Sequence, residues 1–245
     1  MIVDSRKRCD VTDHPLRPFV PYIALSLVQL VVLYTGPGWA VTSSKALLMP
    51  LLAAGVLVAL RRPLRSQVWL LLAALAGSWV GDVLLSFPGW FMPGLLAFLA
   101  AHVAFIVLFL RLPVTAGRRR LPAWTLVYAA WYVAFLALLG AHLGALLVPV
   151  AVYGAVLGTM AALAGGRGGV IALGGAFFVV SDSVLALGRF LPGYEFALHD
   201  LVVMSTYLAA QGLIAWGVVT GLRADPAASA RPSLAPDRRA DATGR

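Results

Sequence analysis

Two aspartates lie inside the most hydrophobic stretches of this 245-residue chain. Asp82 follows the apolar segment 67–81, and Asp182 lies within the apolar segment 175–187. A carboxylate inside a bilayer-spanning helix costs about 2.5–3.5 kcal/mol on insertion scales, so such a residue marks a functional site by default. Two carboxyl groups that share a site away from water can hold one proton between them at neutral pH. The pair therefore indicates acid–base chemistry inside the membrane, although which aspartate is the acid stays open.

Five more polar side chains lie in the apolar segments and are candidates for binding or supporting roles: Lys45, His102, Arg189, Tyr207 and Gln211. Lys45 and Arg189 can each pair with an aspartate, or can bind a phosphate group, which arginine does with two parallel hydrogen bonds. His102 also fits a hydrogen-bonded helix interface, and Tyr207 and Gln211 fit interhelical hydrogen bonds. We expect both aspartates, Lys45, His102 and Gln211 to face one cavity in the outer half of the membrane.

The chemistry of two carboxyl groups requires no metal and no other cofactor. His102, His142 and His199 could in principle join the aspartates in a zinc site. However, the sequence contains no His-x-x-x-His spacing, which places two ligands on one helix face. We therefore expect no metal and no cofactor.

The composition is that of an integral membrane protein. Hydrophobic residues make up 61% of the chain and charged residues 12%, whereas soluble domains carry about 25% charged residues. A run of about 20 apolar residues spans a bilayer core. Such runs lie at 18–35, 43–60, 67–87, 91–111, 122–140, 144–164, 169–190 and 199–222. The predicted fold class is therefore an all-α membrane protein with eight transmembrane helices.

The basic residues predict the orientation of this helix bundle. With eight helices, all 19 lysines and arginines except Lys45 and Arg189 fall on the side of the two termini. The positive-inside rule then places both termini in the cytoplasm, in a multi-pass protein of the cell inner membrane. Short basic clusters beside membrane spans meet anionic lipid headgroups. We therefore expect membrane lipids as partners and no nucleic acid.

The chain divides into three parts. Residues 1–17 form a polar cytoplasmic arm, residues 18–222 form the transmembrane domain, and residues 223–245 form a cytoplasmic tail. The tail is rich in Ala, Pro, Asp and Arg, which predicts disorder. Cys9 in the arm is the one cysteine of the chain, so a disulfide framework is excluded.

The two aspartates have matching surroundings, which predicts a duplicated four-helix unit. Val-Leu follows Asp82 directly and follows Asp182 after one serine, and a Pro-Gly turn comes after each segment. The next apolar run contains Phe-Leu-Ala-Ala-His102 in one half and Tyr207-Leu-Ala-Ala-Gln211 in the other. Because each unit has an even number of helices, the halves would be parallel repeats. The alternative is chance similarity between leucine- and alanine-rich helices.

This arrangement resembles the YhhN family of membrane proteins over roughly residues 40–220. The matching pieces are Ser44-Lys45-Ala-Leu-Leu-Met-Pro50, Gly81-Asp82-Val-Leu-Leu85, His102, Phe178-Val-Val-Ser181-Asp182-Ser-Val-Leu-Ala186, and Tyr207 with Gln211. Ala46 departs from the proline that we expect the family to favour after the lysine.

The resemblance implies hydrolysis of the vinyl-ether bond of a lysoplasmalogen, because characterised animal members of the family are lysoplasmalogenases. The products would be a fatty aldehyde and a glycerophospho-headgroup, and the substrate a lysophospholipid. A vinyl ether is cleaved by protonating its alkene carbon, and water then captures the oxocarbenium ion. This chemistry resembles glycoside hydrolysis, in which one carboxyl group is protonated and the other is ionised. On this basis Asp82 and Asp182 are the expected catalytic residues.

Two other classes of protein remain open from the residues alone. A transporter or channel could use the aspartates as a relay for protons or cations, and the predicted repeat would suit it. A structural or signalling membrane protein could use the charged residues only as pairs that hold helices together. A hydrolase needs an occluded pocket that opens to the lipid, whereas a transporter needs access from both faces of the membrane.

Overall fold

The computed structural model describes residues 16–60, 65–113 and 121–224, and every regular element in these ranges is helical. The long helices are α1 (Val20–Thr35), α2 (Gly38–Leu60), α3 (Ser66–Leu85), α4 (Phe91–Arg111), α5 (Val127–Leu143), α6 (Leu147–Ala164), α7 (Gly169–Phe190) and α8 (His199–Ala224). Short 3-10 helices precede three of them: η1 (Arg17–Phe19), η2 (Ala123–Leu126) and η3 (Gly144–Leu146). The expected all-α class is confirmed. The predictions for Cys9, for the arm up to residue 15 and for the tail from residue 225 lie outside the described residues.

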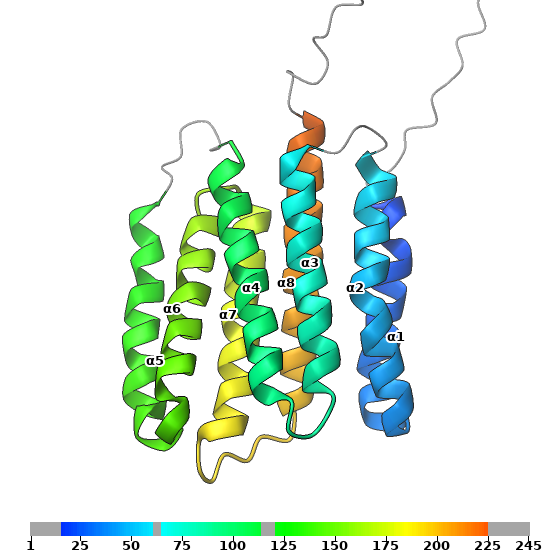
Figure 1. Ribbon diagram of the computed structural model, residues 1–245. Coiled ribbons are helices and arrows are strands. Elements are labelled where there is room, and N and C mark those ends of the chain that lie inside the picture. The colour runs from blue at the N-terminus through cyan, green and yellow to red at the C-terminus, as the bar shows by residue number, and fades with distance from the viewer. Residues whose placement is uncertain (1–15, 61–64, 114–120, 225–245) are drawn as a thin grey trace, which may run out of the picture.

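Seven segments of the described chain are long and apolar enough to cross a membrane, as a multi-pass membrane protein requires. One of these segments, Ala123–Ala164, has 42 residues and contains both α5 and α6. Between these helices Gly144 has a φ of 51°, in the left-handed region that favours glycine. Figure 1 shows α5 and α6 side by side, joined at the lower end. The start of α5 differs from the expected position 122, because residues 123–126 form η2.

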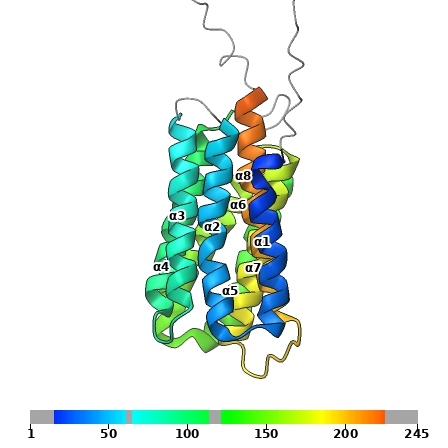
Figure 2. The ribbon, with the colours of Figure 1, turned by 90° about the vertical axis from the view of Figure 1, so that its right-hand side faces the viewer.

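The helices stand side by side in one bundle (Figure 1). The hairpins α3–α4 and α7–α8 form its centre, with α2 packed against α3 and α8, and α6 packed against α4 and α7. Figure 2 shows α1 and α8 on one side of α2, and α3 and α4 on its other side. The two central hairpins therefore bring α3 and α7, which carry the two aspartates, into the middle of the molecule.

Glycines allow the helices of each central hairpin to approach closely. A Cβ atom at Gly81 of α3 would lie 2.5 Å from the ring of Phe98 in α4. A Cβ atom at Gly174 of α7 would lie 2.7 Å from the side chain of Ile214 in α8. Helices in a bilayer associate through such close packing, because lipid tails are as apolar as the helix surfaces. The glycines thus fix the position of α3 directly before Asp82 and of α7 two turns before Asp182.

One end of the bundle contains the first and the last described residues. At this end, two arginines also contact the ends of other helices. Arg223 of α8 donates from Nε to the carbonyl oxygen of Ala59 in α2, at 3.1 Å. Arg167, after α6, donates from Nη1 to the carbonyl oxygen of Leu112 after α4, at 3.0 Å. This is the upper end in Figure 1. The loops at the lower end include both Pro-Gly turns, in which Gly89 and Gly193 have φ values of 82° and 70°.

Candidate active site

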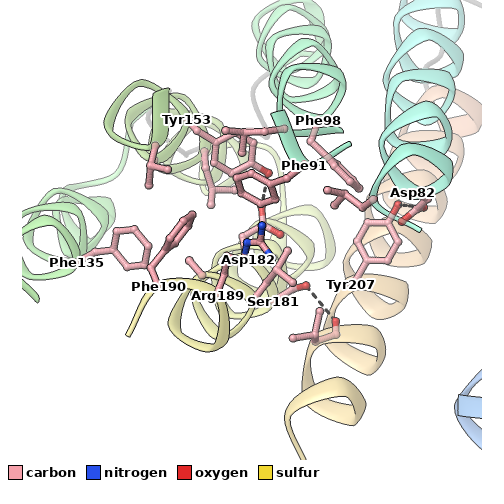
Figure 3. A pocket seen from close by; sticks show the side chains of 18 of the residues that line it. Asp82, Phe91, Phe98, Phe135, Tyr153, Ser181, Asp182, Arg189, Phe190 and Tyr207 are labelled. Carbon is pink, nitrogen blue, oxygen red and sulfur yellow. Dashed lines mark hydrogen bonds between the residues drawn. The ribbon is translucent and has the colours of Figure 1, made fainter. Parts of the chain in front are cut away.

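A pocket of about 190 Å³ lies inside the bundle and is lined by residues from the long helices α2 to α8. Its polar groups come from Lys45, Asp82, Tyr153, Ser181, Asp182, Arg189 and Tyr207. The rest of its wall is apolar: Leu85, Phe91, Leu95, Phe98, Trp131, Phe135, Val150, Gly154, Leu157, Leu185, Ala186, Phe190, Val203 and Met204. Both aspartates therefore line one apolar cavity, as the sequence predicts (Figure 3).

The first carboxyl group, that of Asp82, has partners on both oxygens. The hydroxyl of Tyr207 donates to Oδ2 at 2.6 Å, and Nζ of Lys45 lies 3.4 Å from Oδ1. Nε2 of Gln211, one helical turn after Tyr207, donates to the Tyr207 hydroxyl at 3.3 Å. Asp82 is 3% exposed, and so the ion pair with Lys45 and the phenol replace nearly all of its contact with water.

The second carboxyl group, that of Asp182, has partners on one oxygen. The hydroxyl of Tyr153 donates to Oδ2 at 2.6 Å. Nε2 of His102 lies 3.0 Å from the Tyr153 hydroxyl and 3.4 Å from the same Oδ2. His102 is fully buried, whereas the Asp182 side chain is 13% exposed. A compact triad from α4, α6 and α7 therefore holds Asp182 at the wall of the pocket, and Figure 3 shows two of its members, Tyr153 and Asp182.

Aromatic rings hold the two carboxyl clusters next to each other. The ring of Phe178 meets the rings of His102 and Tyr207 edge to face, with centroids 5.1 Å and 5.8 Å apart. Phe178 lies one helical turn before Asp182 on α7 and is fully buried. Phe98 of α4 meets the Tyr207 ring in the same way at 5.9 Å. These edge-to-face contacts, a favourable arrangement for aromatic pairs, pack the rings that carry the hydrogen-bonding groups against one another.

Arg189 lines the same pocket as the two carboxyl groups but forms no ion pair with either of them among the described residues. Its guanidinium group stacks over the ring of Phe91 at 4.9 Å, and Phe91 in turn meets Phe190 edge to face at 5.7 Å. Arg189 is an exposed pocket residue at the end of α7, and none of the ion pairs among the described residues involves it. An unneutralised arginine at the mouth of an apolar pocket can bind an anionic group.

The structure brings most of the predicted site residues together. Lys45, Asp82, Asp182, Arg189 and Tyr207 line the pocket. His102 and Gln211 do not line it, contrary to the expectation that they face the cavity, because each lies behind a tyrosine to which it is hydrogen-bonded.

Tyr153 is a pocket residue, hydrogen-bonded to Asp182, that the sequence prediction missed. It is the only tyrosine of α6, which is otherwise apolar except for Thr159. Its position, six residues after the start of α6, is close to that of Lys45, seven residues after the start of α2. A search for polar groups at corresponding depths of the two halves could have found it.

The charged and titratable side chains of the site are grouped around its two carboxyl groups. Within the described ranges, no three His, Cys, Asp or Glu residues are grouped as they would be to hold a metal ion. The polar groups bond to one another across helices instead. Such a site can transfer protons to a ligand that is itself largely apolar, while an anionic part of that ligand stays near Arg189.

These features define the class of the protein: a multi-pass helical membrane protein with two carboxyl groups in one internal pocket. The sequence model of the YhhN family matches residues 41–218, which include both aspartates. The chain therefore belongs to the YhhN family, and the expected resemblance is confirmed.

Several curated relatives cover most of the chain. Lysoplasmalogenase TMEM86B of Mus musculus is 35% identical over 201 residues, which are 81% of this chain and 84% of the relative. The Rattus norvegicus protein of the same name is 35% identical over 201 residues, 81% of each chain. A lysoplasmalogenase of Mycobacterium tuberculosis is 36% identical over 198 residues, 76% of this chain and 73% of the relative. No solved structure matches the chain.

Proposed function

We propose that this protein is an intramembrane hydrolase that cleaves the vinyl-ether bond of lysoplasmalogens. The products are a fatty aldehyde and a glycerophospho-headgroup. Two independent facts support this function over transport: relatives from mammals and a mycobacterium carry the name lysoplasmalogenase, and two carboxyl groups line one apolar pocket. The shared pocket of Asp82 and Asp182 is the observation that carries the proposal.

The pocket suits the chemistry of a vinyl ether. Protonation of the alkene carbon gives an oxocarbenium ion, so the reaction needs a proton donor and a nearby negative charge. A retaining or inverting glycosidase meets the same need with two carboxyl groups. We infer that Asp82 and Asp182 are the catalytic residues and that the apolar wall from α4, α5 and α6 holds the alkenyl chain.

The other polar residues have supporting roles in this proposal. Lys45 and Tyr207 hold the Asp82 carboxyl group, with Gln211 behind Tyr207. His102 holds the cluster of Asp182. Arg189 at the pocket mouth binds the phosphate of the substrate, because Lys45 is already engaged by Asp82.

We further propose eight membrane crossings in two parallel four-helix repeats, with both termini in the cytoplasm of an inner-membrane protein. The crossing domain comprises residues 18–222, between a cytoplasmic arm at 1–17 and a cytoplasmic tail at 223–245. The separate helices α5 and α6 and the charge bias support this topology. The repeat is supported by Lys45 and Tyr153, which meet Asp82 and Asp182 from α2 and α6, the corresponding helices of the two halves.

The substrate class can be tested with the purified full-length protein in detergent or lipid nanodiscs. We expect free aldehyde to be released from a lysoplasmalogen, and no fatty acid from an ester lysophospholipid with the same headgroup and chain length. Release of fatty acid from the ester, without aldehyde from the vinyl ether, would show an esterase and overturn the proposal.

A further inference from the structure

The two carboxyl groups of the pocket differ in how their oxygens are bound. On Asp82, Oδ2 accepts from Tyr207 and Oδ1 faces the Lys45 ammonium. On Asp182, Tyr153 and His102 both lie on Oδ2, and the described residues place no hydrogen-bond or ion-pair partner on Oδ1. Asp182 is also the more exposed to the cavity, at 13% against 3% for Asp82. Only Asp182 therefore has an oxygen that the protein leaves available to a ligand.

The charges around the two carboxyl groups also differ. Asp82 lies beside a lysine, and an opposite charge at this distance favours the ionised carboxylate. The groups on Asp182 are a phenol and an imidazole. Since the Tyr153 hydroxyl donates to Asp182, Nε2 of His102 must carry the hydrogen that it donates to the Tyr153 oxygen. Nδ1 of His102 is buried without a partner, so a second proton there would create an unpaired buried charge. Asp182 thus forms no ion pair with a lysine or arginine among the described residues, although Arg189 of the same helix lines the same pocket.

From these differences we propose that Asp182 is the proton donor of the site, that Asp82 remains a carboxylate, and that Tyr153 is a positioning residue for Asp182. Tyr153 and His102 hold Oδ2, which directs the protonated Oδ1 into the pocket. This assignment deepens the proposed hydrolysis and rests on it for the chemical step alone. The protonation states themselves are properties of the unliganded protein and can be measured without turnover.

The assignment gives a balanced reaction. The O–H bond at Asp182 Oδ1 breaks, and its proton forms a new C–H bond with the alkene carbon that is not bonded to oxygen. The alkene electron pair is used in that bond, which leaves an oxocarbenium ion that the Asp82 carboxylate stabilises. Water adds to the ion and passes one proton to Asp82, giving a hemiacetal. The hemiacetal then loses its O–H proton as its C–O bond to glycerol breaks, and the glycerol oxygen takes up a proton. Transfer of the proton held by Asp82 back to Asp182 restores the site.

Burial favours the opposite assignment and must be weighed against the charges. Asp82 is the more buried carboxyl group, and burial alone favours the neutral form of an acid. However, a buried pair in which both partners are ionised loses several kcal/mol when one charge is left alone. A protonated Asp82 would leave the Lys45 ammonium as such a charge in the apolar pocket. The ion pair therefore outweighs the difference in burial.

Infrared spectroscopy of the unliganded full-length protein tests the assignment directly. A protonated carboxylic acid gives a C=O stretching band that shifts in D₂O. A carboxylate gives no band at the frequency of this C=O stretch. We expect this band in the wild type and in Asp82→Asn, and its loss in Asp182→Asn. Tyr153→Phe should keep the band but move it to higher frequency, because the C=O oxygen loses a hydrogen bond.

Tyr132→Phe is the matched control, since the Tyr132 hydroxyl donates to the carbonyl of Ala151 and does not line the pocket. It should leave the band unmoved. A band that disappears in Asp82→Asn and persists in Asp182→Asn would reverse the assignment. Absence of the band in the wild type, or its loss in both aspartate variants, would also overturn it. Because no substrate is present, these results stand apart from whether the protein hydrolyses a vinyl ether.

Discussion

At the residue scale, Lys45 and Arg189 are the two basic side chains of the pocket, and the structure separates them. Lys45 lies 3.4 Å from Asp82, whereas Arg189 lies over Phe91 at the pocket end of α7. The sequence could not distinguish their roles, because both residues lie in the outer halves of apolar segments. Lys45 is paired with the Asp82 carboxyl group, and this leaves Arg189 as the basic group that we propose for an anionic ligand.

The first prediction concerns Lys45. Replacing it with Met removes the charge that keeps Asp82 ionised, so kcat for lysoplasmalogen hydrolysis should fall by about 10²-fold, the usual cost of removing one preorganised charged or hydrogen-bonding group. The KM should change little, because Lys45 does not touch the phosphate. Steady-state kinetics measure both constants, and Lys45→Arg, which keeps the charge, should retain more activity. An increased KM with an unchanged kcat would place the phosphate at Lys45 instead.

The second prediction concerns Arg189. Arg189→Met should raise KM for a lysoplasmalogen by about tenfold, which corresponds to about 1.4 kcal/mol of lost binding. The kcat should be nearly unchanged, because the phosphate contact is present in both ground and transition states. A neutral 1-alkenylglycerol, which has no phosphate, serves as the matched substrate and should show no change. If KM rises equally for both substrates, Arg189 acts on the shape of the pocket and not on the phosphate.

At the element scale, the sequence predicts the helices well because apolar segments and their breaks are visible in it. The run expected at 91–111 is α4 (Phe91–Arg111), and the run expected at 169–190 is α7 (Gly169–Phe190). The predicted start of the helix at residue 122 is wrong, because η2 precedes α5, which begins at Val127.

The sequence cannot predict which helix supplies the partner of each aspartate, since this depends on packing between segments far apart in the chain. Tyr153 lies 29 positions before Asp182, and Tyr207 lies 125 positions after Asp82. The same limit explains His102 and Gln211. Their helix positions are predictable, but whether they face the cavity or support a tyrosine depends on the neighbouring helix.

The third prediction tests the packing of α7 on α8. A Cβ atom at Gly174 would lie 3.0 Å from the carbonyl oxygen of Ala210 as well as 2.7 Å from Ile214, so the backbone itself leaves no room. Gly174→Ala should therefore lower stability by about 1–3 kcal/mol, the range typical of overpacking. Gly221→Ala is the control, because a Cβ there meets no atom within 4 Å. Thermal unfolding in one detergent compares the two variants, and equal midpoints would show that this contact does not limit α7–α8 packing.

At the scale of the whole molecule, the arginines that bind backbone carbonyl groups and the arginine of the pocket lie toward opposite ends of the helix bundle. Arg167 and Arg223 bind carbonyl groups at the end where the described termini lie, and Arg189 lies toward the opposite end. Under the proposed topology the pocket opens in the outer half of the membrane. A lysophospholipid in the outer leaflet could then place its phosphate at Arg189 and its chain among the helices.

The fourth prediction follows from this topology. A reporter fused after Arg223 should be cytoplasmic, because the positive-inside rule retains the arginine-rich side. In a Cys9→Ser background, a cysteine placed at Ala197 in the α7–α8 loop should react with a membrane-impermeant thiol reagent added to intact spheroplasts. A cysteine at Gly166, in the α6–α7 connection, is the control and should react only after lysis. A periplasmic reporter after Arg223 would contradict both the orientation and the even number of crossings.

The most direct test of the central claim, that Asp82 and Asp182 act together in vinyl-ether hydrolysis, is aldehyde release by Asp→Asn variants. Asn keeps the size of the side chain but can neither donate an acidic proton nor carry charge. We predict that Asp82→Asn and Asp182→Asn each lower kcat for a lysoplasmalogen by about 10²–10⁴-fold, the usual contribution of general acid–base groups. Asp200→Asn, at a carboxyl group that is 69% exposed and outside the pocket, should release aldehyde at the wild-type rate. Wild-type rates in both folded pocket variants would contradict the two-carboxyl mechanism.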